Sequence, residues 1–500
     1  MQAQRGPVAS FSRPARAITQ PYCLPRLGAD THATMDTHML RRAALALTTL
    51  SVLAGPAQTS PGTIPTMPGP VELDQLRARL HDTAPPAPAP GKVALRPVAG
   101  MPTLGGMYRR LPQPPARWRG QAIVLEGGSF DLASVAAALP DPGWLDCDGS
   151  RCILSAPLVV GRGTTLVIDG IDLRLGQDEG AALLSWGQLI ISDATLRAWH
   201  LSSDTPAATD DKGAAFRPHL AAFAASHTLI RRSDLHHLGH QGAMSYGLSF
   251  GTEGRSGIVT EHPSVDMIGN RLLDVYFGFF SFDADGVNIL DNHIAESHVY
   301  GIDPHDDTRN MLIHGNYVLG ARHSHGIILS RRIHNTVVSY NVSAGNKKAG
   351  IFLDKACHDV LIIGNDSFLN GTEGLTLHEV ARVAVIGNRF HNNAADGIRL
   401  RASEQVFLDG NTVTANGKHG LRAYDWQGSK RAPNTEEQGQ ILPMRVGLVG
   451  NRVHSNKRGD CRLSGEARIT SGQPFLCPVP PPPQAQAVPA RFGPGAGNAP

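Results

Sequence analysis

The chain has 500 residues, a formal net charge of +3 at pH 7 and an aromatic content of only 6%. A charge so close to zero excludes nucleic-acid binding through bulk electrostatic attraction, so any cationic site must be local. The length allows either one large repeat domain or several smaller domains, and the 54 glycines favour a chain with many tight turns.

Residues 1–57 have the pattern of a leader. Met39-Leu40-Arg41-Arg42 precedes an apolar run from Ala43 to Ala54, and small residues follow to Ala57. This order predicts a cleaved signal peptide over residues 39–57, and therefore an exported protein. A membrane anchor is the weaker alternative, because a bilayer span needs about 20 apolar residues. We expect no membrane span in the mature chain, and the true start of translation stays open.

The next segments differ in composition. Residues 58–120 are predicted to be a Pro-rich linker and N-terminal strap, with one short helix at Val71–His81. Residues 121–477 carry short apolar runs bounded by Gly, Asp, Asn or Ser, which predicts strands and turns throughout. Residues 478–500 form a Pro/Ala/Gly tail without a hydrophobic period, which predicts disorder.

The cysteines are spaced as in an exported protein. Cys147 and Cys152 bracket a tight loop, and Cys461 and Cys477 flank the last ordered-looking stretch, so we predict these two disulfides. Cys357 is then expected to be a buried single thiol. The alternative in which all of them are reduced stays open.

A corner glycine recurs at intervals of 23–25 residues, at Gly278, Gly301, Gly326, Gly350, Gly374, Gly397 and Gly420. A fixed strand-like repeat of this length predicts an all-β solenoid, a right-handed parallel β-helix with about 23–25 residues per coil. A second register supports this fold, because an asparagine that can hydrogen-bond along its own column follows a short apolar strand in each coil. Its members are Asn292, Asn316, Asn341, Asn365, Asn388 and Asn411, and Asn451 continues it after an insertion at Trp426–Pro443.

The strand after each corner glycine has two sides. Its first and third residues are apolar and are expected to point inward, so its second and fourth residues point outward. Stacked coils about 4.8 Å apart then form a charged groove on the order of 20–25 Å long, which suits an extended anionic polymer. The residues predicted to bind substrate there are Asp354, Lys355, His378, Glu379, Arg399, Arg401 and His325.

The strand from Tyr300 to Asp306 stands out, because Asp303, His305 and Asp306 surround a proline that costs a ladder hydrogen bond. These groups suit removal of the weakly acidic proton next to a uronate carboxylate, which needs a base and a cation on that carboxylate. His305 can be the base, and Arg331 on the next coil can neutralise the carboxylate with two parallel donors. Asp303 or Asp306 can orient the imidazole or cap the turn, and Tyr300 can deliver a proton to the opposite face of the sugar.

The motif Asp303-Pro304-His305-Asp306 and the following strand His325–Arg331 resemble those of the periplasmic alginate (polymannuronate) C5-epimerases. Other similar pieces, within a resemblance that covers roughly residues 120–425, are Ala156–Val160, Tyr276–Phe279 and Phe352–Asp354. The resemblance implies a right-handed parallel β-helix in the periplasm that converts β-D-mannuronate to α-L-guluronate within the polymer. It implies an anionic polysaccharide, alginate, as the partner, and leaves room for a periplasmic polysaccharide-export complex.

Carried over by motif, His305 matches the base, Arg331 the carboxylate-neutralising residue, and Tyr300 a tyrosine that donates a proton in related secreted epimerases. Water is the alternative donor, and Asp303 and Asp306 match positions with either a structural or a catalytic role. No nonapeptide calcium repeats occur, so no cofactor is expected; Ca²⁺ is not implied, although clustered carboxylates could bind it. The insertion and the tail fall outside the resemblance.

Three other activities stay open on the sequence alone. A polyuronate lyase shares the first two steps and then expels the 4-linked sugar, which yields an unsaturated, ultraviolet-absorbing product. A non-catalytic carbohydrate-binding β-helix would keep its function without His305. A glycoside hydrolase would need a carboxylate pair, for which Asp303 and Asp354 are the candidates.

Overall fold

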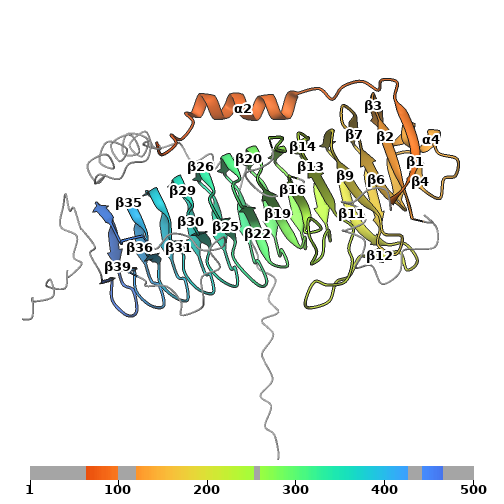
Figure 1. Ribbon diagram of the computed structural model, residues 1–500. Helices are drawn as coiled ribbons and strands as arrows, with labels where there is room; N and C mark the ends of the chain where they lie inside the picture. Colours follow the sequence, from red (N-terminus) through yellow and green to blue (C-terminus); the bar gives the residue numbers. More distant parts are fainter. Residues whose placement is uncertain (1–62, 99–119, 253–259, 426–441, 465–500) are drawn as a thin grey trace, which may run out of the picture. The chain divides into compact units, whose positions relative to one another are not determined.

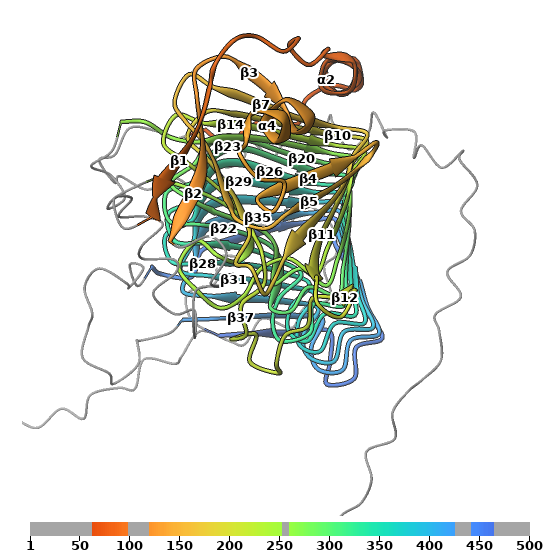
Figure 2. The same ribbon diagram turned by 90° about the vertical axis from the view of Figure 1, so that its right-hand side faces the viewer.

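Short strands stack in register into three long sheets in the computed structural model, which describes residues 63–98, 120–252, 260–425 and 442–464 (Figure 1). Each coil adds one strand to each sheet, so neighbours in a sheet come from successive coils and pair in parallel. The all-β parallel solenoid predicted from the repeat is confirmed, and in Figure 2 the coils lie behind one another. The predicted leader, the tail and residues 426–441 of the insertion lie outside the described residues.

Sheet 1 contains the strands that follow the corner glycines. Their inward side chains, such as Ile302, Ile327 and Leu329, are fully buried, which confirms the predicted two-sided pattern. Its fourteen described strands are β1 (Lys92–Pro97), β2 (Gln121–Glu126), β6 (Pro157–Val160), β9 (Ala182–Ser185), β13 (Leu220–Phe223), β16 (Gly247–Gly251), β19 (Phe277–Phe282), β22 (Tyr300–His305), β25 (Ile327–Ser330), β28 (Ile351–Asp354), β31 (Leu375–His378), β34 (Ile398–Arg401), β37 (Leu421–Tyr424) and β40 (Cys461–Leu463).

Sheet 2 follows sheet 1 around each coil. Its twelve described strands are β3 (Ser129–Asp131), β7 (Thr165–Asp169), β10 (Gln188–Ser192), β14 (His227–Arg231), β17 (Ser264–Ile268), β20 (Asp285–Leu290), β23 (Arg309–His314), β26 (His334–Ser339), β29 (His358–Ile363), β32 (Ala381–Ile386), β35 (Glu404–Asp409) and β38 (Val446–Val449). The inward residues of these strands share one apolar core with those of sheet 1.

Sheet 3 closes each coil with shorter strands. They are β4 (Leu145–Asp148), β5 (Arg151–Leu154), β8 (Asp172–Gly176), β11 (Thr195–His200), β12 (Thr205–Pro206), β15 (Asp234–His236), β18 (Arg271–Leu273), β21 (His293–Ala295), β24 (Tyr317–Leu319), β27 (Val342–Ala344), β30 (Asp366–Phe368), β33 (Arg389–His391), β36 (Thr412–Thr414) and β39 (Arg452–His454).

The corner glycines are required by close packing between sheets 3 and 1. A Cβ atom on Gly301 would overlap Val318 of the neighbouring strand, and one on Gly350 would overlap the Ser367 hydroxyl. Both glycines have ordinary backbone angles, so the constraint is space rather than a left-handed conformation. The period that identifies the fold is therefore the period of this tight contact.

The predicted asparagine column is a continuous hydrogen-bonded ladder. The Asn341 side chain donates to Asn365 and the Asn365 side chain donates to Asn388, each at 2.9 Å. Asn411 donates directly to Asn451 at 2.8 Å, so the insertion between them adds no coil to the stack. A second ladder, which the sequence analysis did not identify, runs through Asn346, Asn370, Asn393, Asn416 and Asn456.

The N-terminal end of sheet 1 is covered by β1, which pairs antiparallel with β2 along its whole length. The sequence analysis placed these residues in a linker and did not predict the strand. This pairing gives hydrogen-bond partners to the backbone N–H and C=O groups at the edge of β2, which would otherwise be unpaired.

The predicted helix at Val71–His81 is α2 (Pro70–Asp82), which lies along sheet 2 (Figure 1). It starts with Pro at its first position, where a missing N–H costs nothing. Arg77 donates to both carboxylate oxygens of Asp291, at 2.7 and 3.0 Å. Arg231 of β14 donates to the backbone carbonyls of Leu80 and His81. The helix is thus tied by hydrogen bonds to two separate coils of the stack.

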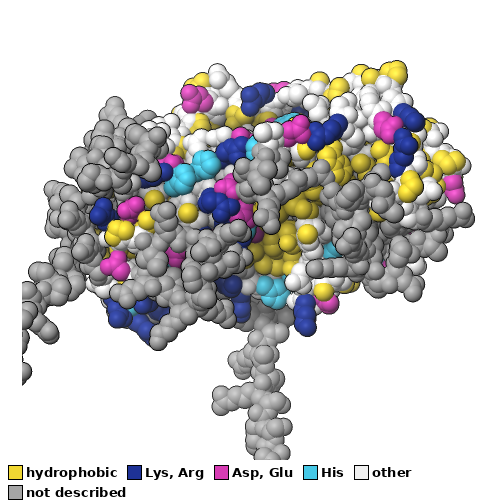
Figure 3. All heavy atoms as spheres, viewed as in Figure 1, with side chains coloured by type: hydrophobic (Ala, Val, Ile, Leu, Met, Phe, Trp, Pro, Cys, Tyr) yellow, Lys and Arg dark blue, Asp and Glu magenta, His cyan; other side chains and the backbone are white. Residues whose placement is uncertain are grey.

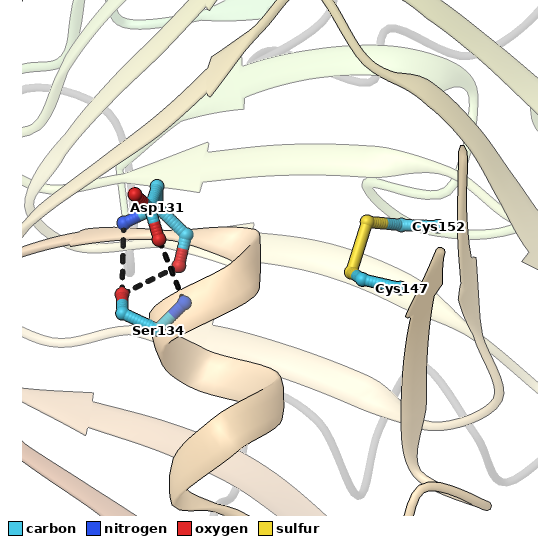
Figure 4. Close-up of a disulfide and its surroundings, with 4 residues drawn as sticks. All are labelled: Asp131, Ser134, Cys147 and Cys152. Carbon is cyan, nitrogen blue, oxygen red and sulfur yellow. Dashed lines mark hydrogen bonds between the residues drawn. A yellow bond between two sulfur atoms is a disulfide. The ribbon is translucent and has the colours of Figure 1, made fainter. Parts of the chain in front are cut away.

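The predicted disulfide between Cys147 and Cys152 is present and joins the paired strands β4 and β5 (Figure 4). Near it, Asp131 caps α4 (Leu132–Ala138) by accepting a hydrogen bond from the Ser134 N–H at 2.7 Å. Cys461 is also disulfide-bonded, but Cys477, its expected partner, lies outside the described residues. Cys357 is a buried free thiol, as predicted. Within the described ranges, no helix is long and apolar enough to cross a membrane.

We predict that Asn365→Ala lowers the free energy of unfolding by about 2–4 kcal/mol, because it leaves buried groups on two neighbouring coils without partners. Asn365 is 1% exposed and bonds to Asn341, Asn388 and the Val338 carbonyl. Denaturant unfolding measures the change. Arg389→Ala, a largely exposed position nearby, is the control and should shift stability by less than about 0.5 kcal/mol. Equal effects of the two changes would contradict the structural role of the ladder.

Candidate active site

A cavity of about 310 Å³ opens on the outer face of sheet 1 over β16 to β25. Four of the five predicted catalytic residues, all except Arg331, line it, so the structure brings these four together. Hydrophobic side chains gather on the middle of this face, with charged side chains beside them toward the C-terminal coils (Figure 3). The residues that line the cavity are Tyr246, Phe277, Phe280, Phe282, Tyr300, Asp303, His305, Asp306, Ile328 and Ser330.

His305 is held by its neighbour Asp306. The His305 Nδ1 atom lies 2.5 Å from Asp306 Oδ2. Burial acts to raise the pKa of Asp306, but the hydrogen bond from His305 and the charges of Arg331 and Arg332 outweigh it and lower this pKa. An ionised carboxylate can only accept, so Nδ1 carries the hydrogen and the Nε2 lone pair is available to take a proton.

Arg331 reaches the same carboxylate from the next coil. Its Nη1 atom lies 3.7 Å from Asp306 Oδ2, the oxygen that contacts His305. Both side chains stay partly open to solvent, at 23% for His305 and 26% for Arg331. Arg332 donates to Asp306 Oδ1 at 3.0 Å and to Asp307 at 2.7 Å. One carboxylate therefore fixes the predicted base and the predicted cation at the same point.

The corner between sheets 1 and 2 makes this contact possible. Asp306 and Asp307 have φ angles of 32° and 61°, and Arg331 and Arg332 have φ angles of 66° and 60°. Non-glycine residues in the left-handed region are energetically unfavourable and are common at functional sites. Because two consecutive coils turn in the same way, Arg331 lies beside Asp306 rather than above His305.

Asp303 lies in the cavity wall but is only 2% exposed. Burial raises the pKa of its carboxyl to about 7, although the nearby His305 acts in the opposite direction. Its Oδ1 atom is buried without a hydrogen-bond partner. Asp303 therefore does not orient the imidazole, a role that the geometry gives to Asp306.

Tyr300 faces the same cavity at the start of β22. Burial and the nearby Asp303 carboxyl raise the pKa of its phenol, so it keeps its proton at neutral pH. Its ring packs edge-to-face on Phe277, with the ring centroids 4.9 Å apart. Its orientation is thus fixed by the aromatic wall.

Tyr246, Phe277 and Phe282 complete that wall together with Phe280, and the sequence analysis did not predict Tyr246, Phe277 or Phe282 as site residues. The register contained a signal for Phe282, which is fourth after the corner Gly278 as His305 is fourth after Gly301. The two are paired neighbours on β19 and β22. Tyr246 precedes the regular repeat, so no periodic signal marked it.

A second cavity of about 210 Å³ lies over the later strands of the same sheet. It brings together four of the predicted substrate-binding residues, His325, His378, Arg399 and Arg401. The other residues that line it are Lys348, Phe352, Thr372, Glu373, Thr376 and Tyr424.

Three predicted substrate-binding residues line neither cavity. Asp354 accepts a hydrogen bond from Ser330 at 2.8 Å, and burial raises its pKa. Glu379 is 5% exposed and lies 2.7 Å from His378 Nε2, so it supports that imidazole rather than facing the groove. Lys355 lies at the corner after β28, with a φ of 52°. Among the described residues, no group of three or more His, Cys, Asp or Glu side chains is arranged to hold a metal ion.

Comparisons with known proteins agree with this architecture. The family model described as "right handed beta helix region" matches residues 277–436 and 357–470. A mannuronan C5-epimerase of Pseudomonas putida is 31% identical over 264 residues, which are 52% of this chain and 51% of that protein. The mannuronan C5-epimerase AlgG of Azotobacter vinelandii is 32% identical over 263 residues, 52% of this chain and 50% of that protein. The chain thus spans about half the length of these sequence relatives.

The crystal structure of the periplasmic alginate epimerase AlgG superposes with a TM-score of 0.72 at 24% identity, over 83% of this chain and 100% of that one. By fold, the chain is therefore a right-handed parallel β-helix protein, as predicted. Within that class, its sequence is similar to these mannuronan C5-epimerases over about half of their length.

We predict that Asp303→Asn stabilises the protein at high pH but not at low pH. Asp303 keeps its proton in the folded chain up to about pH 7, against a reference value of 3.8. Its contribution to stability is therefore complete below about pH 4 and is lost as the pH rises through 7. Above that pH the variant should gain up to about 4 kcal/mol over the wild type.

Denaturant unfolding at about pH 4 and about pH 8 measures this effect. The two proteins should be nearly equal at the lower pH and differ at the higher one. A difference that is independent of pH would contradict the buried, protonated state of Asp303.

Proposed function

We propose that the chain is a mannuronan C5-epimerase, which converts β-D-mannuronate residues of a polymer to α-L-guluronate. The observation that carries this proposal is the pair of contacts at Asp306 Oδ2, 2.5 Å to His305 and 3.7 Å to Arg331. A base and a cation that share one anchor can act on the C5 proton and the adjacent carboxylate of one sugar. The sequence relatives, which are named mannuronan C5-epimerases, support it.

The first step is proton transfer from C5 to His305 Nε2. Asp306 accepts from Nδ1–H, which fixes the tautomer and stabilises the imidazolium that forms. The aromatic wall of Phe280 and Phe282 limits water around the ring, and the Phe280 and His305 ring centroids are 6.0 Å apart. A drier site strengthens the electrostatic contribution of each neighbouring charge.

Arg331 carries out the second task. Loss of the C5 proton moves negative charge onto the sugar carboxylate, and the guanidinium offers two parallel donors to that group. The anchoring contact to Asp306 Oδ2 is long, at 3.7 Å, so a substrate carboxylate can compete for the same guanidinium. The cation therefore stabilises the enolate-like state that the base creates.

Reprotonation from the opposite face completes the inversion. Tyr300 holds its proton, faces the cavity and is fixed by Phe277, so we assign it the donor role, with water as the alternative. Asp303 lies in the same wall, and burial raises its pKa to about 7. Its protonated carboxyl limits the negative charge around the developing enolate. No step in this scheme uses a cofactor or Ca²⁺.

The setting of this activity belongs to the same proposal. The polymer is alginate or its precursor polymannuronate, and the site of action is the periplasm, reached through a cleaved signal peptide. A periplasmic polysaccharide-export complex is the expected context. Secretion of the full chain and sequencing of the mature N-terminus test this part separately from the chemistry.

We predict that the mature protein, incubated with polymannuronate in deuterated water, places deuterium at C5 and produces guluronate signals in NMR. Chain length should not change, because reprotonation replaces elimination. His305→Ala should abolish the exchange. Arg331→Lys should lower the rate about 10²–10³-fold, since a point charge cannot replace the guanidinium fork.

The same experiment separates the competing activities. An unsaturated product that absorbs in the ultraviolet, with chain shortening, would identify a lyase. Absence of isotope uptake from a folded, polymer-binding protein would leave only the binding function. Arg452→Ala on sheet 3 is the matched control and should keep the full rate.

We also predict that Asp306→Asn lowers kcat at least about 100-fold with a much smaller change in KM, because the amide no longer selects the Nδ1–H tautomer. The pH profile carries the specific signature. Loss of the carboxylate removes the negative charge that stabilises the imidazolium, so the acidic limb of kcat should move to lower pH. A variant whose pH profile is unchanged would contradict the assigned role of Asp306.

A further inference from the structure

The two cavities on sheet 1 carry opposite charge. Among the described residues that line the catalytic cavity are the acids Asp303 and Asp306, and none is Lys or Arg. The lining of the second cavity contains three cations, Lys348, Arg399 and Arg401, and one acid, Glu373. Three positive charges and one negative charge leave +2 when histidine is neutral. Arg331 supplies one cation beside the first cavity, so the lining of the second cavity offers a polyanion the larger positive charge.

We infer that the second cavity is a carboxylate-binding subsite that holds a uronate several units away from the reacting sugar, toward the C-terminal coils. This inference rests on the proposed function, and it adds a preferred substrate length to it. A polymer long enough to reach both cavities gains carboxylate contacts that a short oligomer lacks.

The spacing follows from the register. His305 pairs with Ser330, Ser330 with Asp354, Asp354 with His378, and His378 with Arg401. Four steps of about 4.8 Å place Arg401 about 19 Å from His305 along the stack. An extended 4-linked uronan advances by a similar length per sugar as the stack does per coil, so the bound carboxylate belongs to a unit about four sugars away.

His378 shows why this cavity binds rather than catalyses. It is fourth after the corner Gly374, as His305 is after Gly301, and an acid follows it in both strands. Its Nε2 contacts Glu379 at 2.7 Å, whereas Arg401 donates to the ring from the next coil. Both imidazole nitrogens are thus engaged, so no lone pair is left for a base.

Two of the cations of the subsite, Arg399 and Arg401, are held in place by neighbouring side chains. Arg399 forms an ion pair with the buried Glu373, and Tyr424 hydrogen-bonds to both Arg399 and Arg401. A fixed guanidinium loses less conformational entropy when it binds a carboxylate. One acid among three cations lowers the total charge but orients Arg399.

The part of the second cavity on the coils nearest His305 contains two uncharged rings, those of His325 and Phe352. Burial and the nearby Lys348 lower the pKa of His325 to about 3, and its Nδ1 accepts from the Ala349 N–H at 3.1 Å. The ring stacks on Phe352 with centroids 4.5 Å apart. Sugars that follow the reacting unit therefore meet these rings and Lys348 first, and the two arginines lie at the far end of the cavity.

The test compares a trimer and a heptamer of mannuronate as substrates of the wild type and of the Arg399→Ala/Arg401→Ala double variant. For the wild type, KM should be much lower for the heptamer. In the variant, KM for the heptamer should rise about tenfold or more with kcat nearly constant, so that most of the length preference disappears. Isotope labelling should place the exchanged C5 near one end of the heptamer rather than at its centre.

The matched control is Arg389→Ala, an exposed arginine on sheet 3, which should keep the length preference. If the double variant does not fold, KM of the wild type for both oligomers is measured at increasing salt concentration instead. The KM for the heptamer should then rise more steeply with ionic strength than the KM for the trimer. Equal changes for the two substrates, in the variant or with salt, would overturn the subsite.

Failure of the proposed function looks different. If the wild type exchanges no deuterium with either oligomer, the epimerase proposal falls. The subsite is then judged by affinity alone, measured by calorimetry with the heptamer and the trimer. A heptamer that binds no more tightly than the trimer would overturn it.

Discussion

Every feature of this protein depends on the in-register stacking of its coils. Close packing of each corner glycine against the neighbouring strand and two asparagine ladders prevent a coil from slipping by even one residue. A slip of one residue would exchange the inward and outward faces of a strand. Because the register is fixed, a residue at a given position after the corner glycine always lies beside its counterpart on the next coil. The active site is a consequence of that rule.

Asp306 converts this regular scaffold into a reactive site. The left-handed corner after β22 turns its carboxylate toward His305 and Arg331, and Arg332 supports it from the other side. The same corner on the C-terminal coils carries Glu379 beside His378, but there Arg401 occupies the imidazole. His305 and His378 occupy the same position in their coils. They differ because Arg401 of the next coil donates to the His378 ring, whereas Arg331 of the next coil contacts Asp306.

The sequence predicted the fold well, because the glycine and asparagine periods report tight packing and hydrogen bonding that any substitution would break. It also identified Tyr300, Asp303, His305 and Asp306 as neighbours, since strand alternation places them on one face. It could not separate the roles of Asp303 and Asp306, because the difference between a buried carboxyl and an ion-paired one depends on the corner geometry. It wrongly placed Glu379 and Lys355 in the groove. Both are corner residues with a left-handed backbone, so the alternation of side chains along a strand does not predict where they point.

The second cavity shows another limit of sequence patterns. The repeat predicted Arg399 and Arg401 as groove residues. It did not predict that the described lining of the catalytic cavity contains no Lys or Arg. Charge on a solenoid face is a property of several coils together. The aromatic wall was hidden for a similar reason, since Tyr246 belongs to a coil whose loops depart from the regular period.

The central claim is that one sugar is held by Arg331 at its carboxylate while its C5–H points at His305. A crystal structure of the inactive His305→Gln variant with a mannuronate oligomer tests it most directly. The account predicts a sugar in the aromatic cavity, its carboxylate on the Arg331 guanidinium and its C5 within reach of the residue-305 side chain. A carboxylate bound away from Arg331, or a C5–H directed to the opposite side of the ring, would contradict it.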